Sequence, residues 1–132
     1  MYVAAARKSL GEQGEEIARD FLKKKHFEII ARNWRPAKQR SGGIRGEVDI
    51  VAKDPNDSQI VFVEVKTLRE PNTDDLSPEH HFTYKKFSKL KQLSQLFMIE
   101  NGMSGAEYRI DVITVAFVNG RYEVRHYEGV AS

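Results

Sequence analysis

The chain has 132 residues, of which 40% are hydrophobic and 30% are charged, and its formal net charge is +2. This length and composition are typical of one globular domain with a single hydrophobic core. The absence of cysteine excludes disulfides and cysteine-ligated zinc sites. The N-terminal segment lacks the apolar region of a signal peptide, and no apolar run reaches the ~20 residues that span a bilayer. We therefore expect a cytoplasmic protein that does not enter the membrane.

Positive charge is concentrated in two segments. Between positions 19 and 45, nine Lys and Arg residues are opposed by only two acids, Asp20 and Glu28. A second group of lysines, at positions 85, 86, 89 and 91, contains no acid. Segregated positive charge indicates a surface that binds a polyanion such as nucleic acid. Charge alone leaves open the alternative that each segment is simply a solvated helix face.

The first predicted element is a helix over residues 9–25, in which Ile17 and Phe21 recur at helical spacing and Ser9 and Glu12 match a capping box. A second helix is predicted over residues 79–100. Runs rich in β-branched and aromatic residues predict five strands. These strands cover residues 27–34, 47–52, 60–67, 106–118 and 121–128. Residues 35–46 combine Pro, Ser, three Gly and four basic residues, which is typical of a loop.

The order of these elements is helix, three strands, helix, two strands. The first three strands can form an antiparallel meander, and the second helix is long enough to link the third and fourth strands as a parallel crossover. Asn119-Gly120 predicts a tight hairpin between the last two strands. The sequence therefore predicts an α/β fold in which helices flank a mixed central sheet.

Three charged residues interrupt the most apolar strands. Alternation places Glu64 and Lys66 on one face of the third strand, with valines on the other face. A turn centred near positions 56 and 57 places Asp49, in the second strand, opposite Glu64. Buried charges are costly unless they are paired, hydrogen-bonded or bound to a metal. We therefore expect Asp49, Glu64 and Lys66 to converge on one site.

Two neighbouring carboxylates can hold a divalent cation, and oxygen ligands favour Mg²⁺ or Mn²⁺. Such a cation can activate water for attack on a phosphate, while Lys66 can orient that water or stabilise the transition state. The alternative is that Lys66 forms a structural ion pair with Asp49 or Glu64. In the first helix, Glu15 lies at the margin of the apolar face and could reach the same site, or it could be an ordinary boundary residue near the helix N-terminus.

Several motifs together resemble the bacterial YraN-type family of uncharacterised proteins. They are G-x-x-G-E-x-x-A at 11–18, A-R-N-W-R at 31–35, G-E-x-D-x-x-A at 46–52, V-F-V-E-V-K-T at 61–67 and R-x-D at 109–111. That family belongs to the restriction-endonuclease-like PD-(D/E)xK superfamily and is similar to archaeal Holliday junction resolvases. Val48 stands where the superfamily signature has proline.

The resemblance implies a restriction-endonuclease-like fold and a metal-dependent nuclease. It implies catalytic roles for Asp49, Glu64, Lys66 and Glu15, with metal bound by Asp49, Glu64 and Glu15, and it favours Glu15 over Glu16. Asp111, in the R-x-D motif, is interpreted as a supporting residue. The expected substrate is DNA rather than RNA, and a homodimer is expected. The alternative is a nucleic-acid-binding or protein-interaction module without turnover. The side chains expected to bind nucleic acid are Arg35, Lys38, Arg40, Arg45, Lys85, Lys86 and Lys89.

Overall fold

The computed structural model describes residues 8–38, 42–70 and 82–130. The elements, in order, are α1 (Leu10–Lys24), β1 (Glu28–Trp34), β2 (Val48–Lys53), β3 (Ile60–Arg69), α2 (Tyr84–Glu100), β4 (Tyr108–Val118) and β5 (Arg121–Tyr127). The predicted order is therefore confirmed, and most predicted boundaries lie within two residues of the observed ones. Neither helix in these described ranges is long and apolar enough to cross a membrane.

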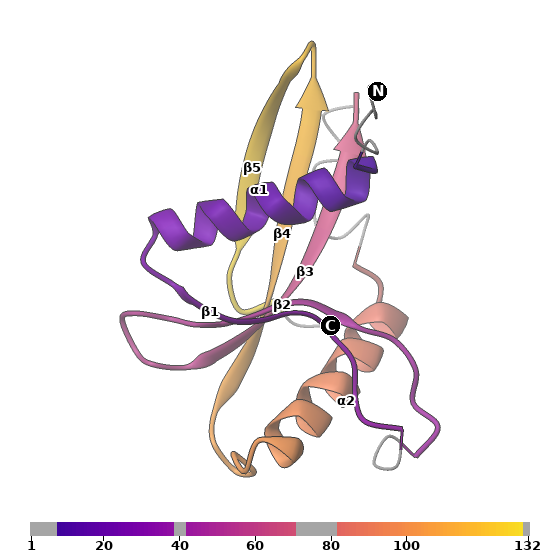
Figure 1. The fold of residues 1–132 in the computed structure, drawn as a ribbon, viewed down its shortest axis with the longest axis vertical. Helices are drawn as coiled ribbons and strands as arrows, with labels where there is room; N and C mark the ends of the chain where they lie inside the picture. The colour runs from indigo at the N-terminus through magenta and orange to yellow at the C-terminus, as the bar shows by residue number, and fades with distance from the viewer. Residues whose placement is uncertain (1–7, 39–41, 71–81, 131–132) are drawn as a thin grey trace, which may run out of the picture.

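The five strands form one sheet in the order β1-β2-β3-β4-β5. Strands β3 and β4 are parallel, and the other neighbouring pairs are antiparallel. Figure 1 shows α1 crossing one face of the sheet, while α2 lies toward its lower end. This arrangement confirms the predicted mixed α/β sheet and is consistent with a restriction-endonuclease-like fold.

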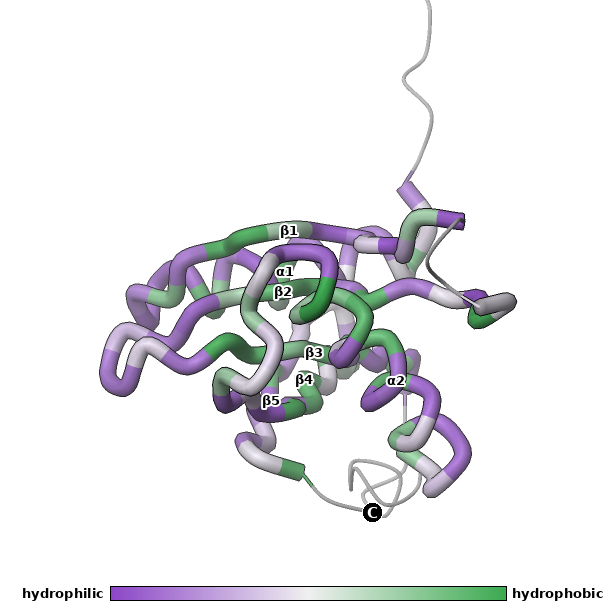
Figure 2. The backbone as a smooth tube through the Cα atoms, turned by 90° about the horizontal axis from the view of Figure 1, so that it is seen from below, coloured by the Kyte–Doolittle hydropathy of each residue, from purple (hydrophilic) through white to green (hydrophobic). Residues whose placement is uncertain are grey.

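The core has two parts, one on each face of the sheet. On the face covered by α1, Leu22 packs with Val61 and Val63 of β3. On the other face, Leu93 of α2 packs with Phe62. Because β3 is covered on both faces, apolar residues occupy both of its alternating positions, as predicted. In Figure 2 the hydrophobic segments follow the middle strands, and the turn between β2 and β3 is hydrophilic.

The start of α2 differs from the prediction. The helix begins after Thr83, whose hydroxyl accepts a hydrogen bond from the backbone N–H of Lys86. Phe82 and Thr83 are not helical, and residues 79–81 of the predicted helix lie outside the described ranges. Sequence reasoning missed this N-cap because Lys86 occupies the position where a capping box has Glu or Gln.

A close approach between α1 and β3 depends on Gly14. A Cβ atom at this position would lie 1.9 Å from the Oγ1 atom of Thr67, far inside contact distance. Only glycine therefore lets the helix lie this close to the C-terminal part of β3. The next residue of the helix, Glu15, is thereby held at that end of the sheet.

A buried polar network ties the start of β4 to the end of β5. Asp111 is fully buried and accepts hydrogen bonds from Arg109, from the ring of His126 and from the backbone N–H of Gly129. Burial raises the pKa of Asp111, but these hydrogen bonds outweigh that effect and hold the pKa below its ordinary value. Arg109 also pairs with Asp54 at 2.7 Å. The satisfied network agrees with the interpretation of Asp111 as a supporting residue.

Candidate functional site

The predicted acidic pair lies where β2 and β3 stop pairing. The paired residues run from Lys53↔Ile60 to Ile50↔Val63, and extending this register by one position sets Asp49 opposite Glu64. Just beyond the last pair, the Oδ2 atom of Asp49 accepts a hydrogen bond from the backbone N–H of Val65 at 2.8 Å. Both acidic side chains are half-buried. The turn-based register used for the sequence prediction therefore agrees with the structure.

The two carboxylates repel one another, and burial is the main cause of the pKa shift of each. Burial, then the charge of Glu64, raises the pKa of Asp49 from 3.8 to about 8, while the Val65 hydrogen bond opposes this shift and Glu15 and Glu47 add to it. Burial likewise raises the pKa of Glu64, although nearby lysines partly offset the effect. A carboxyl group with a raised pKa releases its proton readily only when positive charge arrives.

Lys66 lies close enough to Glu64 to lower its pKa. However, within the described residues its ammonium group forms no salt bridge or hydrogen bond with either acid. The alternative of a structural ion pair therefore has no support in the geometry. The side chain is half-buried and remains available to a bound molecule.

Two further residues join the site, and sequence reasoning missed both. The amide of Asn33 in β1 donates to Glu15 at 2.6 Å and to Glu47 at 3.3 Å. Glu47 also pairs with Arg35 at 3.0 Å. Glu47 could have been found from the sequence, because it lies two positions before Asp49 and alternation places both on one face. Asn33 gives no such signal, because its role depends on contacts between segments distant in sequence.

Glu15 and its neighbour Glu16 differ in their surroundings. Glu15 is half-buried and acts electrostatically on both Asp49 and Glu64. Glu16 instead forms a salt bridge with Lys8 at 2.6 Å. Glu15 is thus the acid of α1 that belongs to the candidate site.

The lysines of α2 face the same space as the acids. A hollow of about 410 Å³ has Glu47 and Glu64 among its lining residues, together with Lys85, Lys86 and Lys89 of α2. Among the charges acting on Glu64, that of Lys86 lowers the pKa most. The hollow therefore combines carboxylates with cationic groups, which is the arrangement needed to bind a phosphate next to a metal ion.

Gly46 is the last residue of the segment 35–46, which we call the basic loop, and it lies close to α2 beside this hollow. Its φ of +130° favours glycine, and a Cβ atom would lie 3.2 Å from the Cε atom of Lys89 and 3.3 Å from the Cδ1 atom of Leu93. The contact fixes the start of β2, and with it Glu47, relative to the lysines of the helix.

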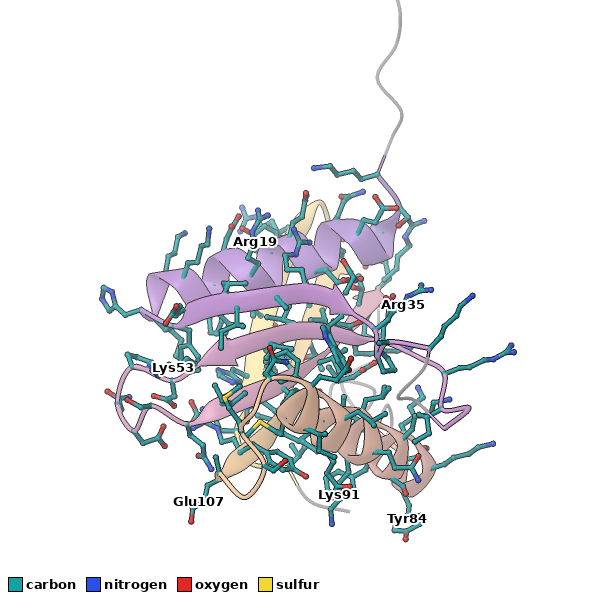
Figure 3. The ribbon with its side chains drawn as sticks, turned by 60° about the horizontal axis from the view of Figure 1, so that its bottom comes forward. Arg19, Arg35, Lys53, Tyr84, Lys91 and Glu107 are labelled. Atoms are coloured by element: carbon teal, nitrogen blue, oxygen red, sulfur yellow. The ribbon has the colours of Figure 1, made fainter. Side chains whose placement is uncertain are left out.

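The basic loop forms a second, larger hollow of about 620 Å³. Its lining includes Arg35, Lys38 and Arg45, which are exposed. Arg40, the fourth predicted side chain of this loop, lies outside the described residues. Figure 3 shows Arg35 extending from the edge of the molecule, whereas Lys91 of α2 points away from the sheet. Arg35 thus lines this hollow, and its salt bridge with Glu47 also connects it to the acidic site.

Trp34 follows Asn33 and packs inward. Its ring meets that of Phe97 edge-to-face, with centroids 5.2 Å apart. The indole is therefore part of the packing under α2, and stacking on a nucleic-acid base is not required to explain it.

The donor set suits a hard divalent cation but is not a complete cage. Across residues 8–38, 42–70 and 82–130, no three His, Asp or Glu side chains form a group that could hold a metal by themselves. Mg²⁺ usually keeps several waters and is bound by one or two carboxylates together with substrate phosphates. The pair of Asp49 and Glu64 fits that mode of binding.

Comparison with known proteins identifies the family. The model of the uncharacterised protein family UPF0102 matches residues 14–115. A UPF0102 protein of Caldicellulosiruptor saccharolyticus is 39% identical over 118 residues, covering 89% of this chain and 90% of the relative. One from Carboxydothermus hydrogenoformans is 32% identical over 124 residues, covering 94% and 96%. One from Thermotoga maritima is 34% identical over 119 residues, covering 90% and 94%. The match includes the acidic pair, Lys66 and the lysines of α2, and the chain belongs to the UPF0102 family.

Proposed function

We propose that this protein is a metal-dependent endonuclease that hydrolyses phosphodiester bonds of DNA. The observation that carries the proposal is the half-buried pair of Asp49 and Glu64, in which burial raises the pKa of both carboxyl groups and which lies beside the lysines of α2. A purely structural role would not require acids whose ionisation opposes folding. Mg²⁺ or Mn²⁺ would supply positive charge that favours the ionised form of both acids.

Each residue has a role in the proposed reaction. Asp49 and Glu64 would hold the cation, with Glu15 as a third acid beside them, and the Val65 N–H fixes the orientation of the Asp49 carboxylate. When bound, the cation would supply a Lewis acid that neutralises phosphate charge and favours ionisation of water. Lys66 holds the attacking water or stabilises the charge that develops on phosphate oxygens. Water would attack phosphorus and give up one proton to solvent, one P–O ester bond would break, and the leaving oxygen would take up a proton.

The basic side chains serve substrate binding. Lys85, Lys86 and Lys89, which line the hollow at the acids, would contact the phosphates flanking the scissile bond, and the loop carrying Arg35, Lys38 and Arg45 would extend the contact along the backbone. Arg40 completes this proposed set. Such binding is steeply dependent on salt. We propose branched or damaged DNA as the substrate class, in cytoplasmic repair or recombination.

The test is cleavage of labelled duplex, nicked, flapped and four-way-junction DNA with Mg²⁺ or Mn²⁺. The wild type should cut at least one substrate, and Asp49→Asn, Glu64→Gln and Lys66→Met should each lose at least a hundredfold in rate. Glu123→Gln changes an exposed acid that pairs with Arg125 and is the matched control. Cleavage that survives in all three variants would exclude this site as the catalytic centre.

The second candidate is a nucleic-acid-binding module without turnover. It is favoured by the basic loop, whose hollow is larger than the one at the acids and has no acid among the described residues that line it. In that case DNA binding should persist in EDTA and in the acid variants, with no cleavage of any substrate in either metal.

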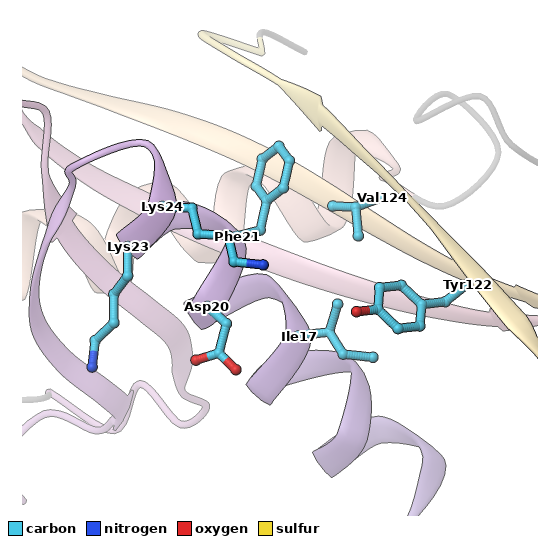
Figure 4. Close-up of a pocket in the computed structure, with 7 residues that line it drawn as sticks. All are labelled: Ile17, Asp20, Phe21, Lys23, Lys24, Tyr122 and Val124. Atoms are coloured by element: carbon cyan, nitrogen blue, oxygen red, sulfur yellow. The ribbon is translucent and has the colours of Figure 1, made fainter.

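We also propose a homodimer through β5, because a small nuclease needs a second subunit to reach two strands. Strand β5 is an edge of the sheet. Figure 4 shows Tyr122 and Val124 of β5 facing Ile17 and Phe21 of α1 across a hollow of about 410 Å³. Analytical ultracentrifugation should give a dimer for the wild type and a monomer for Tyr122→Glu.

A further inference from the structure

Asn33 connects two acids that come from different parts of the chain. Its Nδ2 atom lies 2.6 Å from the Oε1 atom of Glu15 in α1 and 3.3 Å from the Oε1 atom of Glu47, just before β2. A side-chain amide has two N–H donors, so it can serve both carboxylates at once. Hydrogen bonds to ionised acceptors are the stronger kind.

The position of Glu15 depends on this one contact. In the described part of the chain, the Glu15 carboxylate has no other hydrogen-bond partner, whereas Glu47 also has Arg35. The acid nevertheless lies close enough to the pair of Asp49 and Glu64 to affect the pKa values of both. Without the amide, a flexible Glu side chain at the margin of a helix would turn toward water.

The backbone of β1 presents the amide on the required side. Asn33 has a φ of +50°, a left-handed conformation that Asn tolerates better than most residues. Its neighbour Trp34 packs against Phe97 of α2. Ala31 packs on the same side as Trp34, so simple alternation is interrupted at the left-handed Asn33, and its hydrogen bond shows that the side chain reaches Glu15 of α1. The residue type and the backbone conformation both suit the contact.

We propose that Asn33 is the positioning residue that holds Glu15, and with it Glu47, next to the cation bound by Asp49 and Glu64. This proposal rests on the proposed function, since it concerns the same site. Asn33 itself does not touch the metal. It holds two further acids near the pair, where their negative charge acts on both Asp49 and Glu64, and it should therefore increase affinity for the cation.

The test compares Mn²⁺ affinity by calorimetry for Asn33→Gly in the wild-type and Glu15→Gln backgrounds. Glycine keeps the left-handed backbone without strain, so a loss of affinity reports the side chain. We expect about tenfold weaker binding in the wild-type background and no further change in Glu15→Gln. Asn119→Gly is the matched control, because Asn119 has a φ of +51° in the β4–β5 turn, and its affinity should equal that of the wild type.

A second readout does not need metal. The side-chain amide signals of Asn33 in ¹⁵N NMR spectra should shift in Glu15→Gln and stay unchanged in Glu123→Gln. Wild-type Mn²⁺ affinity in Asn33→Gly, an equal loss in both backgrounds, or amide signals insensitive to Glu15→Gln would each overturn the positioning role while leaving the proposed function intact. Failure of the wild type itself to bind Mn²⁺ would instead overturn the proposed function together with this inference.

Discussion

Replacing Asp49 with Asn should stabilise the metal-free protein at alkaline pH. The pKa of Asp49 is raised from 3.8 to about 8 by burial and by Glu64. Between these two values the folded chain retains a proton that the unfolded chain releases, so the free energy of unfolding falls as the pH rises. The amide of Asn removes the charge and can still accept the Val65 hydrogen bond. The free energy of unfolding of the variant should therefore not fall in this way as the pH rises.

The size of the effect follows from the interval over which it acts. From pH 5 to pH 8 the loss is at most roughly 4 kcal/mol, at 1.36 kcal/mol per pH unit. Asp49 keeps some contact with water, and part of its repulsion is with Glu64, whose protonation can change at the same time. Both effects reduce the loss in the free energy of unfolding to about 2–4 kcal/mol. For a domain of this size, that corresponds to a gain in Tm of about 6–12 °C for the variant between pH 5 and pH 9.

The assay is thermal unfolding in EDTA, followed by circular dichroism at pH 5 and pH 9. The difference in Tm between Asp49→Asn and the wild type should widen at pH 9. Mn²⁺ should then raise the Tm of the wild type and leave that of the variant unchanged. A difference that stays constant with pH, or a variant that is less stable at pH 9, would refute the claim that ionisation of Asp49 opposes folding.

Three further predictions concern the packing of α1 on β3, the buried network around Asp111 and the lysines of α2. Gly14→Ala should destabilise the protein by at least about 2 kcal/mol in urea unfolding, because its Cβ would overlap Thr67, whereas Gly11→Ala, whose Cβ has its nearest neighbour at 4.0 Å, should cause no loss. Asp111→Asn should cost roughly 3 kcal/mol at pH 7 in the same assay. Because the pKa of Asp111 is lowered in the folded state, the cost should shrink as the pH falls below 4. Lys86→Met should weaken DNA binding in fluorescence anisotropy and reduce the salt slope by about 1, whereas Lys91→Met should not.

The sheet and the acidic pair were predictable because short-range rules determine them. Alternation assigned the two faces of β3, and the turn between β2 and β3 set Asp49 opposite Glu64. The Asn119-Gly120 hairpin followed from two residues that adopt positive φ, as both do in the structure. These features depend only on residues that are near one another in sequence or in register.

The rest depends on contacts that no local pattern encodes. Asn33 joins Glu15 of α1, 18 positions away, to Glu47, 14 positions away, through a left-handed backbone that the strand-like composition of β1 did not indicate. The proximity of Lys86 to Glu64 depends on how α2 packs over the sheet. Sequence reasoning left Lys85 and Lys86 equivalent, and the structure favours Lys86 as the lysine that acts on the acidic pair.

The central claim is that Asp49 and Glu64 bind a divalent cation, and calorimetric titration with Mn²⁺ tests it most directly. The experiment compares the wild type with Asp49→Asn and Glu64→Gln at low salt, with a DNA duplex or junction present, and uses Glu123→Gln as the control. The account predicts binding by the wild type and the control and loss of binding in both site variants. Equal binding by all four proteins, or no binding by the wild type, would contradict it.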